Sequence, residues 1–152
     1  MSKVTNRLFE LSDKKEVIIL WSLCGLTKPL NDPSKDIERK LSLKDSCFWV
    51  LESSNMIIGT VMFGYGGHRG NVYYFCIHPH FQGKKIGSSI MKKVEKKLMD
   101  MNCPKLNIMV RSTNVKVTDF YESIGYLKED TVLLGKRLIP DEKKLEEEIK
   151  II

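Results

Sequence analysis

Residues 77–89 of this 152-residue chain read IHPHFQGKKIGSS, and this stretch decides the fold. It joins a β-type run at 71–78 to a run in which Ile86, Ile90 and Val94 fall on one helical face. Pro79 ends the strand because proline cannot donate to a sheet. An alternating run at 105–111 follows the helix, so the stretch predicts a right-handed strand–helix–strand crossover with parallel strands.

The turn inside this stretch has the composition of an anion cradle. Gly83 and Gly87 allow backbone N–H groups to converge on one point, and the following helix adds its unpaired first-turn amides and positive dipole end. Lys84 and Lys85 add full charges, which favours a diphosphate over a carboxylate. Neither GxxxxGK[ST] nor GxGxxG occurs here. On these residues alone, a turn without a ligand fits equally well.

Working outward, the remaining patterns predict an α+β (mixed α/β) domain of order β-α-α-β-β-β-α-β-α-β, with about six to seven strands in one mixed sheet. Strands are expected at 4–11, 48–51, 56–63, 71–78, 105–111 and 131–138, and helices at 13–24, from 33, 86–101 and 115–124. Residues 1–140 form the domain, and 141–152 are expected to form a helical tail.

Composition excludes several protein classes. Hydrophobic residues make up 42% and charged residues 29%, as in soluble globular proteins, and the net charge of +6 favours anionic partners. The start lacks a signal-peptide core, and no apolar run approaches the ~20 residues that span a bilayer. The four cysteines lie far apart, without metal-ligand spacing. We therefore expect a cytoplasmic protein with no bound metal and no membrane contact.

Two motifs resemble those of a known family. Residues 77–87 resemble the Val-x-Pro and [Gln/Arg]-x-x-Gly-x-[Gly/Ala] motif of the GCN5-related N-acetyltransferases (GNAT). Asn114 and residues 120–126 resemble the second motif, Asn followed by [Phe/Leu]-Tyr-x-x-x-Gly-[Phe/Tyr]. Segments 24–27, 31–33, 59–62, 66–70 and 134–138 are similar to the small bacterial YpeA-type branch. The resemblance covers essentially the whole chain.

The resemblance implies an acyltransferase that transfers groups other than aminoacyl groups, moving acetyl from acetyl-CoA to a primary amine by direct attack. Tyr121 matches the general acid that protonates the leaving thiolate. The implied cofactor-binding residues are Cys76, Ile77, Gln82, Gly83, Lys84, Lys85, Ile86, Gly87, Ser88 and Asn114. Lys85 departs from the family because it replaces the middle glycine of the motif. If that position needs a positive φ, a side chain there costs about 1 kcal/mol.

The acceptor is expected to be a small molecule, amino acid or peptide. The resemblance places it against the first two helices, their connection and the turn before the cofactor strand. The implied residues are Trp21, Asn31, Asp32, Asp36, Arg39, His68 and Arg69. The general base stays unassigned among Glu52, Asp36, His68, His78 and Tyr74.

Two other functions remain open alternatives. One is a catalytically inactive acyl-CoA-binding module, suggested by Lys85. The other is a nucleic-acid-binding domain, suggested by the stripe of Lys92, Lys93, Lys96 and Lys97, which lacks the interleaved aromatic residues of such surfaces. We expect no nucleic-acid partner, and the sequence leaves a homodimer open.

Overall fold

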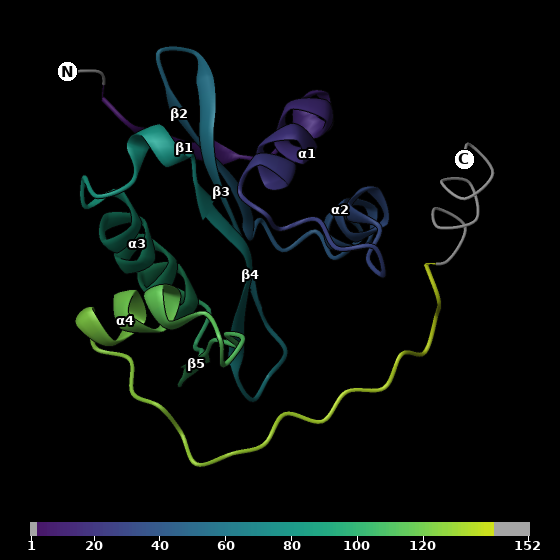
Figure 1. Ribbon diagram of the computed structural model, residues 1–152, viewed down its shortest axis with the longest axis vertical. Coiled ribbons are helices and arrows are strands. Elements are labelled where there is room, and N and C mark those ends of the chain that lie inside the picture. Colours follow the sequence, from purple (N-terminus) through teal and green to yellow (C-terminus); the bar gives the residue numbers. More distant parts are fainter. Residues whose placement is uncertain (1–2, 142–152) are drawn as a thin grey trace.

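A five-stranded mixed sheet forms the centre of the protein in the computed structural model, which describes residues 3–141 (Figure 1). The strands are ordered β1-β2-β3-β4-β5, and every neighbouring pair is antiparallel except the parallel β4–β5 pair. Their bounds are Thr5–Leu8 for β1, Phe48–Ser53 for β2, Met56–Tyr65 for β3, Gly70–Ile77 for β4 and Leu106–Asn107 for β5. The predicted α+β class is confirmed, with five strands within residues 3–141 where six to seven were predicted.

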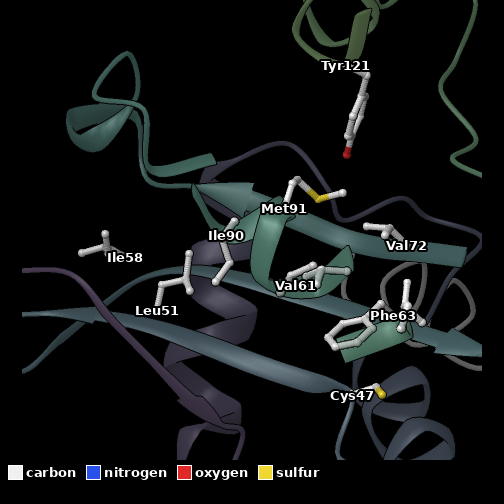
Figure 2. Packing of buried hydrophobic residues seen from close by; sticks show 11 residues of the cluster. Cys47, Leu51, Ile58, Val61, Phe63, Val72, Ile90, Met91 and Tyr121 are labelled. Carbon is white, nitrogen blue, oxygen red and sulfur yellow. The ribbon is translucent and has the colours of Figure 1, made fainter. Parts of the chain in front are cut away.

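Helices cover both faces of the sheet. Figure 1 shows α1 and α2 on one side and α3 and α4 on the other. The helical bounds are Leu11–Asp13 for η1, Lys14–Leu23 for α1, Pro33–Ser42 for α2, Pro79–Phe81 for η2, Ile86–Asp100 for α3 and Val115–Ser123 for α4. Trp21 and Ile37 belong to the core on the first side, and Ile90, Met91 and Tyr121 to the core on the second. Figure 2 shows Tyr121 extending from α4 toward the strands with its hydroxyl leading.

Helix α1 begins and ends within one residue of its predicted bounds, and α2 begins at the predicted Pro33. The Asp32 side chain accepts hydrogen bonds from the Ser34 and Lys35 amides, and Pro33 occupies the first turn of α2. Gly25 follows α1 with a φ of +73°, a conformation that glycine adopts without steric cost. These local signals fix the α1–α2 connection beside the sheet.

A β-bulge interrupts β4 at Tyr74. Thr60 pairs with Cys76 and Met62 with Tyr73, so two residues of β4 oppose one residue of β3. Tyr74 takes a φ of +47° there. Beyond the bulge, Gly59 of β3 pairs with Ile77 of β4. A Cβ on Gly59 would lie 2.7 Å from the Cys76 carbonyl oxygen. The bulge directs the Tyr74 side chain toward α1 and α2.

The strands β4 and β5 pair only at their first residues. Gly70 pairs with Leu106 and Asn71 with Asn107, after which the register ends. The predicted strand at 105–111 is therefore wrong in length. Toward β5, the edge of β4 beyond Asn71 has no strand partner among residues 3–141.

The predicted strand at 131–138 is also wrong. Residues 127–140 run away from the sheet to α2, as Figure 1 shows, and all of them are exposed. The three consecutive apolar residues Val132, Leu133 and Leu134 present no single apolar face, and Gly135 interrupts the run. Arg137 and Asp141 hold the end of this segment against the α2 region. The predicted helical tail lies outside the described residues, apart from Asp141.

Candidate functional site

The turn at 82–85 delivers the chain into α3 with two residues in the left-handed region. Gly83 has a φ of +77°, and Lys85, the N-cap of α3, has a φ of 62° and a ψ of 14°. The Lys85 side chain makes no capping hydrogen bond. The first-turn amides of Ile86, Gly87 and Ser88 have no carbonyl one turn earlier to bind. The positive φ on which the Lys85 prediction depended is therefore present.

The same turn is tied to the end of β4. The Gln82 side-chain amide donates to the Ile77 carbonyl oxygen at 2.9 Å, and the Pro79 carbonyl accepts a hydrogen bond from the Gln82 amide. The Lys84 ammonium group lies 5.4 Å from the centre of the Phe81 ring. The predicted residues Ile77, Gln82 and Lys84 thus lie close together, next to the unpaired edge of β4.

Helix α4 packs against the start of α3 at one close contact. A Cβ on Gly87 would lie 3.1 Å from the Phe120 ring, so the small residue there lets the two helices approach. Asn114 is the N-cap of α4, and its side chain accepts a hydrogen bond from the Val117 amide at 3.3 Å. Its side-chain oxygen is therefore used in the protein's own fold.

Tyr121 lies on α4 in the core beside β4. Its ring centre is 6.4 Å from that of Phe75, the residue before Cys76, and it is 8% exposed. Burial raises the pKa of its phenol to about 12. The hydroxyl therefore keeps its proton throughout the neutral range.

Two hollows adjoin these residues. One of about 230 Å³ lies between the start of α3 and the first two strands, and is lined by Lys84, Lys85, Ser89 and Asn6 among others. The other, of about 750 Å³, lies between β5, α4 and residues 126–133, and includes Tyr121 in its lining. The lysines and Tyr121 thus line separate hollows.

Two thiols meet at the end of β4. The Cys24 sulfur lies 3.7 Å from the Ile77 carbonyl oxygen, and the Cys76 sulfur lies 3.6 Å from the Thr60 hydroxyl. A hydrogen bond from Cys76 lowers the pKa of Cys24 to about 7. The same interaction and burial raise the pKa of Cys76. No local pattern in the sequence indicates that these two thiols are neighbours.

On the face of the sheet that α1 and α2 cover (Figure 1), Tyr74 connects the bulge to α2. Its hydroxyl donates to the Asp36 carboxylate at 2.6 Å, and Arg39 donates to the other oxygen of Asp36 at 3.1 Å. The Trp21 ring stacks on Tyr74 at 3.9 Å, and its indole N–H donates to the Thr60 hydroxyl at 2.8 Å. Burial, and then the Asp36 hydrogen bond, raise the pKa of Tyr74. Asp36 is therefore held at two points.

Two residues that bind the α2 region, Asp141 and Arg137, were not predicted from sequence. Asp141 is 4% exposed, and its carboxylate accepts hydrogen bonds from Arg39 and from the Asp32 amide, both at 3.0 Å. These hydrogen bonds, chiefly the one from Arg39, lower the pKa of Asp141 to about 2. Arg137 donates to Asn31 at 3.0 Å. Both residues come from a segment distant in sequence, and their exposed charged neighbours gave no signal of a site.

The predicted acceptor residues do not all lie together. Asn31, Asp32, Asp36 and Arg39 share the network described above. Trp21 is fully buried, so it supports Tyr74 and faces no solvent. His68 and Arg69 lie in the β3–β4 turn, at the opposite end of β4 from the turn into α3 (Figure 1).

The sequence of the chain matches the acetyltransferase (GNAT) family over residues 15–126. Acetyltransferase YE1169 of Yersinia enterocolitica is 50% identical over 137 residues, which cover 90% of this chain and 97% of that protein. Acetyltransferase YPTB2753 of Yersinia pseudotuberculosis is 47% identical over the same shares. The chain belongs to the GNAT acetyltransferase family. The predicted enzyme class, an acyltransferase, is confirmed with it.

Solved structures share the GNAT fold. Glucosamine-6-phosphate N-acetyltransferase from Arabidopsis thaliana superposes with a TM-score of 0.66 at 21% identity, covering 90% of this chain and 99% of its own. The aminoglycoside N-acetyltransferase AAC(6')-Iy in complex with CoA gives a TM-score of 0.72 at 12% identity, covering 90% and 96%. A predicted acetyltransferase from Clostridium acetobutylicum with acetyl-CoA gives 0.67 at 16% identity, covering 88% and 96%.

The described part of the chain contains neither a membrane-spanning helix nor a cluster of metal-ligating side chains. Within residues 3–141, no helix has both the length and the apolar character needed to cross a membrane. Over the same residues, no group of three or more metal-ligating side chains comes together. In the lysine stripe of α3, Lys93 donates to Asn6 at 3.0 Å and Lys96 pairs with Asp100 at 3.6 Å.

Proposed function

We propose that this GNAT protein transfers an acetyl group from acetyl-CoA to a primary amine by direct attack. One observation carries the proposal: the turn at 82–85, with the first-turn amides of α3 and two lysines, closely follows the end of β4, whose edge toward β5 is unpaired beyond Asn71 within residues 3–141. A diphosphate suits the amides and lysines, and an unpaired strand edge suits the amide groups of a pantetheine arm. Acetyl-CoA carries both chemical features.

Gln82 and Ile77 connect the two halves of this binding surface. Gln82 donates a hydrogen bond to the Ile77 carbonyl, which links the turn to the end of β4. Structures of other GNAT proteins with acetyl-CoA or CoA bound, at 12–16% identity, support the assignment of the co-substrate. Lys85 adds positive charge in a strained conformation, which we expect to tune affinity without abolishing binding.

The chemistry needs no nucleophile from the protein. The neutral amine nitrogen attacks the thioester carbonyl carbon, and the C–S bond then breaks to release the CoA thiolate. Tyr121 donates its phenolic proton to that thiolate, and the amine loses one proton to a base or to water. A phenol with a pKa of about 12 remains protonated until the thiolate forms. The proton lost by the amine replaces, by way of the base or water, the one that Tyr121 gave up, so the products are the amide and the CoA thiol and the enzyme is regenerated.

For the acceptor, we propose a cationic amine that binds at Asp36. Its carboxylate lies between Tyr74 and Arg39 and is 29% exposed, so one face of it stays open to an ammonium group. The aminoglycoside and glucosamine-6-phosphate acetyltransferases that share the fold are named for amine-bearing acceptors. Arg39 suits an additional anionic group on the same acceptor.

Thermal unfolding with added ligands tests the co-substrate. A ligand present at one hundred times its dissociation constant stabilises the folded protein by about 2.7 kcal/mol. We expect acetyl-CoA and CoA to raise the melting temperature, and ATP and short duplex DNA to leave it unchanged. No rise with either CoA species overturns the proposal, and a rise with DNA alone favours nucleic-acid binding.

A second experiment separates an enzyme from an inactive binding module. Thiol release from acetyl-CoA is followed across a panel of cationic amines, amino acids and peptides. Turnover with an amine supports the transferase. Tight CoA binding without turnover across the panel favours the binding module instead.

A further inference from the structure

Two cysteines that are far apart in the sequence, Cys24 and Cys76, come together at the end of β4. Cys24 is the C-cap of α1, and Cys76 lies on β4 opposite Thr60 of β3. Both side chains belong to the core between the sheet and the first two helices, Cys76 as a buried member and Cys24 packed against it. The proposed acetyl transfer uses neither thiol.

Cys24 is the accessible thiol of the pair. The Cys76 carbonyl faces β3, because it lies 2.7 Å from the position of a Cβ on Gly59. Successive carbonyls of a strand face opposite edges, so the Ile77 carbonyl faces the edge of β4 that has no strand partner within residues 3–141. The Cys24 sulfur lies 3.7 Å from that oxygen, and the residue is partly exposed. A small reagent in solution can therefore reach Cys24.

Cys76 is the enclosed thiol of the pair. It is 7% exposed, and its sulfur lies 3.6 Å from the hydroxyl of the fully buried Thr60. When Cys24 is a thiolate, it accepts a hydrogen bond from Cys76, which lowers the pKa of Cys24 and raises that of Cys76. A partly exposed thiolate beside a protected second thiol is the arrangement of an oxidation-sensitive cysteine and its resolving partner.

We propose that Cys24 and Cys76 form a reversible disulfide bond when the protein meets a hydroperoxide. The Cys24 thiolate attacks a peroxide oxygen and the O–O bond breaks, which leaves a sulfenic acid on Cys24. With hydrogen peroxide, the released hydroxide takes up the proton that Cys24 had given to the solvent. The Cys76 sulfur then attacks the Cys24 sulfur, the S–O bond breaks, and the Cys76 proton leaves with the hydroxide as water.

The electrons balance in this reaction. The two thiols lose two electrons to form the disulfide, and the hydroperoxide gains them. Two molecules of a small thiol reverse the bond by exchange and restore both cysteines. The disulfide depends on neither the co-substrate nor the acceptor.

Peptide mapping of the folded wild-type protein tests the disulfide. After treatment with hydrogen peroxide, the free thiols should fall from four to two. Trypsin digestion without reductant should give residues 16–35 joined to residues 70–84, and dithiothreitol should separate them. Wild-type protein that keeps all its free thiols, or whose bond joins other cysteines, overturns the proposal.

Variants of single cysteines test the two roles. Cys24→Ser should form no cross-link. Cys103→Ser is the matched control and should form the wild-type cross-link, because Cys103 is also partly exposed but its sulfur donates to the Lys105 carbonyl at 3.4 Å. In Cys76→Ser the sulfenic acid has no partner, so dimedone should label Cys24. A dimedone label on Cys103 in place of Cys24 overturns the proposal.

Peroxide treatment in urea separates pairing by the fold from chance pairing. The unfolded chain should give mixed pairs of cysteines, because the fold no longer holds the sulfur atoms of Cys24 and Cys76 together. An equal yield of the Cys24–Cys76 bond in the folded and unfolded protein overturns the proposal.

Discussion

Tyr74 on β4 donates its phenolic hydrogen to the Asp36 carboxylate on α2 across 2.6 Å. The bulge in β4 makes this contact, because it turns a strand residue toward the helical layer. Trp21 then fixes the Tyr74 ring by stacking on it at 3.9 Å. The proposed acceptor side of the enzyme thus depends on an irregularity near the end of β4.

Asp36→Asn should lower the pKa of Tyr74, because it removes a negative charge that disfavours the phenolate. Burial remains, so the pKa should stay above its ordinary value. Ultraviolet difference titration measures this, with Tyr74→Phe identifying which phenol titrates. For a cationic acceptor, Asp36→Asn should reduce kcat/KM by roughly 10- to 100-fold. This reduction corresponds to the free energy of one hydrogen bond to a charged group. Unchanged kcat/KM would remove Asp36 from the acceptor site.

Lys85→Gly should stabilise the protein by up to about 1 kcal/mol, because glycine adopts the φ of 62° without steric cost. The greater chain entropy that glycine loses on folding offsets part of this gain. This corresponds to a melting-temperature rise of roughly 2–4 °C. Lys85→Ala is the control, since it removes the charge and keeps the strain. If the Lys85 charge binds a phosphate, both variants weaken CoA binding. If strain limits binding, the glycine variant alone binds CoA more tightly than the wild type.

The sequence predicted elements whose signals are local. The Asp32–Pro33 cap of α2, the stop at Gly25 and the crossover helix after Gly83 each depend on a few adjacent residues, and the structure contains all three. The motif resemblance left open whether the Lys85 position needs a positive φ, and Lys85 has a φ of 62°. These features depend on backbone sterics that the residue types themselves determine.

Features that depend on distant contacts could not be predicted in this way. Val132 and Leu134 have strand-type side chains, but strand formation needs a neighbouring edge, and β5 diverges from β4 after Asn107. The burial of Trp21 and the Cys24–Cys76 contact follow from how α1 packs on β3 and β4. Asp141 reaches Arg39 across most of the chain. No local pattern encodes such contacts.

Tyr121→Phe should lower turnover by about 100-fold or more while CoA affinity stays near the wild-type value, since general acid catalysis contributes about 10²–10⁴-fold. Phenylalanine retains the packing against Phe75 and removes only the proton donor. Tyr126→Phe is the matched control, because Tyr126 lies beside Tyr121 with its hydroxyl bound to Glu95. Steady-state rates and CoA titration measure the two effects. Equal turnover in the wild type and Tyr121→Phe would exclude the acid role.

Gly59→Ala should destabilise the fold by about 1–3 kcal/mol through overpacking. A Cβ at Gly59 would lie 2.7 Å from the Cys76 carbonyl oxygen and 2.9 Å from a Leu51 methyl group, and the backbone atom cannot swing aside. Gly66→Ala is the control, because its Cβ would meet nothing within 4 Å. Urea unfolding of both variants tests this. Equal midpoints for the two variants would show that β3 and β4 separate easily at the predicted cofactor strand.

Cys24 should react with iodoacetamide at a rate that rises with pH around a midpoint of about 7, because the hydrogen bond from Cys76 stabilises its thiolate. Cys47 should stay unreactive there, since burial raises its pKa to about 11. Peptide mass spectrometry assigns the modified residue. Cys76→Ala should move the Cys24 midpoint upward, whereas Cys47→Ala should leave it in place. The same midpoint in the wild type and Cys76→Ala would mean that the two thiols do not interact in solution.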